Sequence, residues 1–229
     1  MQITATKLTR AAGLAAVASG LLFTAVQVKH PEITLDLVGT TQWEGREGMK
    51  VAMAAVALAG ITGMHLRQVR PIGALGLVGY LLFSLGHLAM LCVEMIGLTA
   101  IPVIAQTAPY DVDGVMAVAT NNSTTADIGS FGTLVNVMGI GYILGGLLFG
   151  IALFRAKVLA RWAAALLALA ALATMGPYVM PIVNQRLFAV PNGIAMIGLV
   201  WSLWREQRSA AVESVSVVAG ARLDRAGAR

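Results

Sequence analysis

Two ionisable residues stand inside the long apolar run Pro71–Leu98, where the chemistry of this sequence is best sought. His87 and Glu94 are seven residues apart, about two turns of an α-helix, so both lie on one helix face. Tyr80 lies seven residues earlier on that face. A carboxyl group is costly inside a membrane and usually faces a bundle interior or a cavity, which makes Glu94 the first functional candidate.

The chemistry that a carboxyl group offers in such a place is proton donation. Apolar surroundings disfavour its charged form, so Glu94 is a candidate general acid. The alternative is that Glu94 pairs with Arg186 or with a backbone group and only joins helices; we favour function because intramembrane acids are rare. Because two turns separate His87 from Glu94 by about 10–11 Å, His87 is either a wall or relay residue or an imidazole hydrogen-bonded between helices.

Other polar and aromatic residues are expected to surround Glu94. Glu47 is a second candidate acid, although a carboxylate solvated at the membrane edge is the slightly favoured interpretation. Asp127, in the polar tract NNSTTAD, is a third. Each candidate aromatic residue also fits a role as an interface anchor or packing residue. The residues expected to contact a substrate are His87, Tyr80, Phe83, Trp43, Tyr178 and Asn136.

The elements that must position these residues are membrane helices. The sequence is 58% hydrophobic and only 12% charged, which is too apolar for an ordinary soluble domain. We predict an all-α bundle over residues 1–204, followed by a polar, disordered tail at 205–229. The first span continues past the small residues at 18–20, which favours an uncleaved helix over a signal peptide. The six predicted spans are about 11–28, 48–66, 71–98, 130–154, 162–180 and 187–204.

The distribution of Lys and Arg predicts the orientation of the bundle. The N-terminus, two short turns and the tail are basic, whereas the connections between them are acidic or nearly free of Lys and Arg. Both termini are therefore expected in the cytoplasm, with the protein in the inner (plasma) membrane. The net charge of +5 reflects this topology and not a nucleic-acid-binding patch. The long connection Thr99–Gly129 is expected to fold back over the membrane surface.

Neither a metal site nor a cofactor site is predicted. His30, His65 and His87 are scattered over different depths, and no HxxxH or HExxH pair is present. The single cysteine, Cys92, excludes an internal disulfide and is expected to be a small core residue. The expected partners are a lipophilic small molecule and membrane lipid.

Glycines are concentrated in the predicted spans. Gly73, Gly76 and Gly79 recur every three residues, and the fourth span contains the pairs Gly141/Gly145 and Gly146/Gly150. Such small-residue patterns predict helices that approach each other closely.

Several phrases of the sequence resemble a group of small multi-pass membrane proteins common in actinobacteria. These phrases are His30-Pro31 after the first span, Trp43 before the second, Val93-Glu94 followed by Pro102, and LFRAKVLARWAA at Leu153–Ala164. Many members of that group carry a histidine where Glu47 stands here. The resemblance implies a membrane bundle and no single activity.

In size, multi-pass form and an acid within an apolar bundle, the chain is also similar to the membrane-integral terpene cyclases of bacterial indole-terpenoid pathways. That resemblance implies acid-initiated cyclisation of a linear isoprenoid, in which an alkene or epoxide is protonated and aromatic rings stabilise the cation. Glu94 would be the acid, with Glu47 or Asp127 as further acids. The alternative functions are a small transporter or an accessory or structural subunit without catalytic activity.

Overall fold

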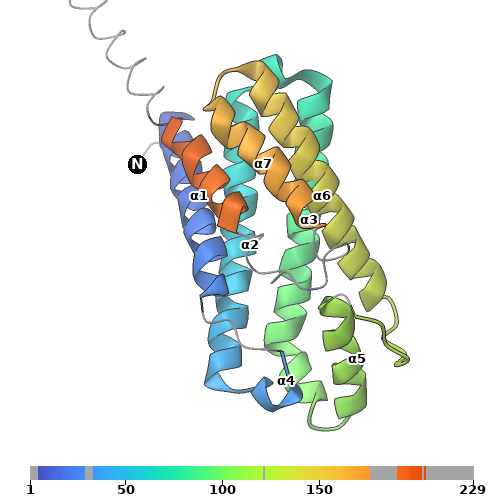
Figure 1. Ribbon diagram of the computed structural model, residues 1–229. Coiled ribbons are helices and arrows are strands. Elements are labelled where there is room, and N and C mark those ends of the chain that lie inside the picture. Colours follow the sequence, from blue (N-terminus) through green and yellow to red (C-terminus); the bar gives the residue numbers. More distant parts are fainter. Residues whose placement is uncertain (1–4, 29–32, 121, 176–189, 203, 205–229) are drawn as a thin grey trace, which may run out of the picture.

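The computed structural model describes residues 5–28, 33–120, 122–175, 190–202 and 204. Within these residues the chain is helical and contains no strand. Four of the described helices are long and apolar enough to cross a membrane: α1 (Ala5–Gln27), α2 (Thr41–Arg67), α3 (Val69–Thr99) and α6 (Phe131–Ala156). They run side by side along the length of the bundle, which is the architecture of a membrane protein (Figure 1).

Two further apolar helices are shorter than a membrane span within the described residues. They are α7 (Arg161–Ala173), which overlaps the predicted span 162–180, and the helix Val190–Ser202, which falls within the predicted span 187–204. Residues 176–189 between them lie outside the described part, so the count of six spans stays a prediction.

Helix α2 begins at Thr41, seven residues before the predicted start at residue 48. The polar stretch before residue 48 was expected to be a connection, but Thr40 caps the helix by accepting a hydrogen bond from the Trp43 amide at 3.2 Å. The added turns are amphipathic, with Trp43 and Glu47 buried and Glu44 exposed. This early start places both candidate residues on a helix instead of a loop.

Helices α3 and α6 form the tightest contact of the bundle. A methyl group at Gly79 would run into the Phe149 backbone, and one at Gly145 would run into the backbone of Phe83. Gly86 and Gly141 likewise face each other, so the two backbones come close over several turns. The prediction of close helix packing is confirmed for this pair.

Gly73 has a different reason to be glycine. Its φ of 57° and ψ of −158° interrupt the first turns of α3, and nothing lies within 4 Å of where its side chain would be. Residues with a Cβ rarely adopt this conformation. The kink lies just after the junction between α2 and α3.

The connection between α3 and α6 folds against one end of the bundle. It contains α4 (Ile101–Ile104) and α5 (Pro109–Ala119), and the 3-10 turn η1 (Leu35–Leu37) lies beside α5. A small second core joins these pieces to α2; its buried members are Trp43, Ile101, Val112 and Met116. The connection therefore covers the end of the bundle at which Trp43 lies.

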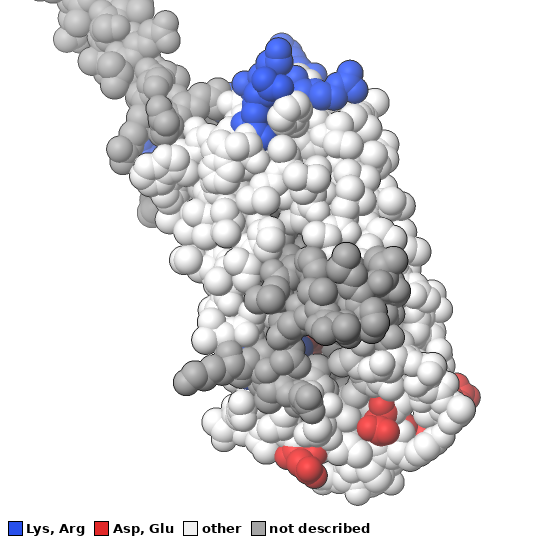
Figure 2. All heavy atoms as spheres, viewed as in Figure 1, with Lys and Arg blue, Asp and Glu red and all other residues white. Residues whose placement is uncertain are grey.

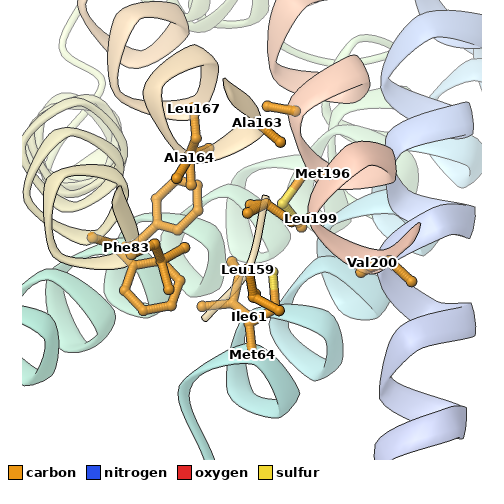
Figure 3. Packing of buried hydrophobic residues seen from close by; sticks show 14 of the residues in the cluster. Ile61, Met64, Phe83, Leu159, Ala163, Ala164, Leu167, Met196, Leu199 and Val200 are labelled. Atoms are coloured by element: carbon orange, nitrogen blue, oxygen red, sulfur yellow. The ribbon is translucent and has the colours of Figure 1, made fainter. Parts of the chain in front are cut away.

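The main core lies in the other half of the bundle. Figure 3 shows α7 and the helix Val190–Ser202 packing their apolar side chains against Ile61, Met64 and Phe83. Figure 2 shows Lys and Arg side chains at one end of the molecule and Asp and Glu at the opposite end. The basic end holds the α2–α3 and α6–α7 turns, and the acidic end holds α4 and α5.

Candidate functional site

A lysine and two glutamates meet in a cluster between α2 and α3. The Lys50 ammonium lies 2.5 Å from Glu47 Oε1 and 2.6 Å from Glu94 Oε2. Glu47 and Lys50 are three residues apart on α2, so they share one face of that helix. Glu94 comes from α3. The cluster therefore joins two neighbouring helices by charge.

The three side chains of this cluster are largely withdrawn from the surface. The exposed fraction is 7% for the Glu47 side chain, 17% for Lys50 and 14% for Glu94. Glu47 is thus buried, whereas the interpretation slightly favoured from sequence left it solvated at the membrane edge. The early start of α2 explains the difference, because it turns Glu47 toward α3.

Gly97 and Trp43 shape the wall of the cluster. The Trp43 indole Nε1–H donates a hydrogen bond to the Gly97 carbonyl at 2.9 Å, which ties the start of α2 to the end of α3. A methyl group at Gly97 would come within 2.7 Å of Glu47 Oε2. Glycine at this position therefore leaves room for the Glu47 carboxylate, and the buried indole of Trp43 holds the two helices in place.

His87 lies in the aromatic centre of the bundle, apart from the charged cluster. It is fully buried, and its Nδ1 is 2.9 Å from the Phe83 carbonyl oxygen, one turn earlier on α3. The ring centroids of Phe83, Tyr142 and Phe23 lie 4.5, 5.6 and 6.3 Å from the centroid of the imidazole. Among the described residues, His87 Nε2 has no hydrogen-bond partner. Its neighbours are those of a packed imidazole, with one ring nitrogen available as an acceptor.

Tyr80 and Phe83 do not join the charged cluster. The Tyr80 ring stacks on His65 of α2 with centroids 4.2 Å apart, and its hydroxyl is 3.3 Å from Thr62 Oγ1. Phe83 is fully buried in the main core. His65 lies in the last turn of α2, toward the basic end, as its place in the sequence predicts.

Two other candidates lie on the surface. Asp127 is exposed, and its Oδ1 accepts a hydrogen bond from the Gly129 amide at 3.0 Å, so it shapes the turn before α6. Asn136 is exposed on α6. Cys92 is exposed on α3, so the prediction that it is a core residue is wrong. Tyr178, His30 and Arg186 lie outside the described residues.

Lys50 and Gly97 are the site residues that sequence reasoning missed. Lys50 falls at the start of the second predicted span, about 48–66, but it was not among the candidate site residues. The available signal was spacing: Lys50 follows Glu47 by three residues, and Gly97 follows Glu94 by three, so each pair shares a helix face. What the spacing does not tell is that these two faces meet.

The described residues hold no group of three or more His, Cys, Asp and Glu side chains arranged to bind a metal ion. Comparison with protein-family models, with curated protein sequences and with solved structures finds no match.

Proposed function

We propose that this chain is a six-span protein of the plasma membrane with both termini in the cytoplasm, and that its charged cluster donates protons to a lipophilic substrate. On the face shown in Figure 2, Lys and Arg gather at one end of the bundle and Asp and Glu at the other, which supports this orientation. The cluster then lies toward the outer side, because α2 runs from the acidic end to the basic end.

The observation that carries the proposal is the single ammonium of Lys50 held between the carboxylates of Glu47 and Glu94. One positive charge does not neutralise two negative charges, so the cluster with both carboxylates ionised has a net charge of −1. Uncompensated charge is costly in apolar surroundings. One added proton, shared by the two glutamates, makes the cluster neutral and provides a carboxylic acid.

The reaction that we propose for this acid is the cyclisation of a linear isoprenoid. The carboxylic acid protonates an alkene carbon or an epoxide oxygen, and the electrons of neighbouring alkenes form the new ring bonds. The resulting carbocation loses a proton to the carboxylate, which restores the acid and makes the overall reaction an isomerisation. Glu94 is the preferred donor, because its side chain is twice as exposed as that of Glu47.

A second candidate function is proton-coupled transport. It is favoured by the position of Lys50 between the two carboxylates. With one carboxyl group protonated the cluster is neutral, and with both ionised it carries one negative charge, so it can take up and release a proton. Such clusters mark proton relays in pumps and transporters. The rings around His87 also pack against one another in the bundle centre. In this alternative the cluster would bind a proton on one side of the membrane and release it on the other.

The test is to incubate membranes containing the protein with farnesyl- and geranylgeranyl-type chains, with and without a terminal epoxide, and to analyse the products by mass spectrometry. We expect a cyclic isomer from the wild type and at least a hundredfold less from Glu94→Gln, since general acid catalysis contributes about 10²–10⁴-fold. Glu44→Gln is the control, because Glu44 is an exposed glutamate in the first turn of α2 and lies outside the cluster.

Each outcome of this test separates the candidates. Absence of any cyclic product contradicts the cyclase. Cyclisation that is unchanged in Glu94→Gln keeps the function and removes Glu94 from the role of donor. Proton flux into protein-containing vesicles under a pH gradient, lost in Glu94→Gln and kept in Glu44→Gln, would favour the transporter.

A further inference from the structure

An apolar groove of about 660 Å³ lies between α1 and α2. Alanines and one glycine line its floor, so side chains fill little of the space between the helices. Gly63 packs directly against Ala12 there. Leu8 and Leu66 form its rim at one end and are 60% and 67% exposed. The lining residues are Leu8, Thr9, Ala11, Ala12, Ala15, Leu58, Ala59, Thr62, Gly63 and Leu66.

The length and direction of the groove follow from the two helices. From Leu8 to Ala15 α1 rises about 10–11 Å, and from Leu58 to Leu66 α2 rises about 12 Å. The helices are antiparallel, so Leu8 and Leu66 both lie at the basic end. The groove therefore runs from the basic end along α1 and α2 toward the middle of the bundle. A lipid acyl chain extends in the same direction, from its headgroup at the membrane surface toward the membrane centre.

Basic residues extend both walls of the groove at that end. Lys7 lies one helical turn before Ala11 on α1, and Arg67 lies one turn after Gly63 on α2. Lys7 and Arg67 also interact with other parts of the chain, so their contribution to the groove is their positive charge. Basic pockets between membrane helices favour anionic lipid headgroups.

We propose that this groove binds one anionic phospholipid, with an acyl chain along the alanines of α1 and α2 and the phosphate group beside Lys7 and Arg67. The site is separate from the charged cluster, which lies toward the opposite end of α2. It does not depend on the activity proposed above.

The experiment is native mass spectrometry of the full chain in neutral detergent, with equal amounts of phosphatidylglycerol and phosphatidylcholine that carry the same acyl chains. We expect one phosphatidylglycerol to be retained at least fivefold more than phosphatidylcholine. Ala59→Phe fills the groove from α2 and should reduce the bound lipid at least fivefold. Ala55→Phe is the matched control: it is exposed on the same helix, one turn away, and does not line the groove.

Two more variants keep the test decisive. Ala11→Phe fills the groove from α1, so it repeats the experiment if Ala59→Phe does not fold. The double variant Lys7→Gln, Arg67→Gln should lose the preference for phosphatidylglycerol over phosphatidylcholine but should still bind lipid in the groove. Equal retention of both lipids by the wild type would overturn the proposal. So would normal phosphatidylglycerol retention in the two groove-filling variants, or a wild-type dimer that Ala59→Phe converts to a monomer.

Discussion

The charged cluster and the aromatic centre both contain ionisable residues of α3, but the surroundings of these residues are opposite in kind: charged in the cluster and apolar in the aromatic centre. Glu94 meets a cation from the neighbouring helix, and Glu47 completes the cluster. His87, two turns deeper, is surrounded by rings, and within the described part of the chain its one hydrogen bond is to the backbone of its own helix. A neutral imidazole tolerates such a place, whereas a carboxylate there would be a buried, unpaired charge.

This difference indicates where a proton can be exchanged. Lys50 and Glu94 keep 17% and 14% of their side chains exposed, whereas His87 is fully buried. Seven residues of one helix thus separate a charged, partly accessible group from an enclosed one. We therefore expect changes in the cluster to have larger effects than changes in the aromatic centre.

The largest effect is expected for Lys50→Met. This change leaves two largely buried carboxylates without their cation, and loss of one partner of a buried ion pair costs about 3–5 kcal/mol. The free energy of unfolding, measured by denaturant titration in detergent, checks this. The triple variant Glu47→Gln, Lys50→Met, Glu94→Gln should recover most of the loss, because no unpaired charge remains. A loss below about 1 kcal/mol would indicate that water, and not Lys50, compensates the carboxylates.

A smaller effect is expected for Trp43→Phe. The variant keeps an aromatic ring but loses the Nε1–H donor to the Gly97 carbonyl, and a broken buried hydrogen bond costs about 1–3 kcal/mol. The same denaturant titration measures it. Trp201→Phe is the control, since the Trp201 side chain is exposed. Equal losses in the two variants would show that the bond to Gly97 contributes nothing specific.

The smallest effect is expected for His87→Phe. A phenyl ring is larger than the imidazole, but its neighbours are rings that can shift against it, so we expect a cost of about 1 kcal/mol, at the low end of the range for overpacking. Unfolding and product formation should both remain near the wild type. If His87→Phe abolishes activity and leaves stability unchanged, His87 is a relay residue and the aromatic centre belongs to the active site.

The arrangement of the helices was largely predictable, and the charged cluster was only partly so. Long apolar runs bounded by basic turns predicted α3 and α6 to within two residues at each end, whereas α1 begins at Ala5, six residues before its predicted start at residue 11. The predicted start of α2 was too late, because its first turns are mostly polar and read as a connection. The structure shows that one side of these turns, with Trp43 and Glu47, is buried. Glu94 was recognised as an acid within a span, but its ion pair with Lys50 was not predicted. Arg186, the partner considered as an alternative, lies outside the described residues.

Hydrophobicity, helical period and the placement of Lys and Arg are local properties, so the sequence alone was enough to predict an all-helical membrane protein with basic turns at one end and an acidic connection at the other. Which helix faces meet became clear from the packing of the helices. Gly86 and Gly141 allow α3 and α6 to touch, and Gly97 leaves room for Glu47 beside Glu94. An isolated glutamate in a span has no defined charge environment; the neighbouring helix supplies Lys50 and thereby its chemistry.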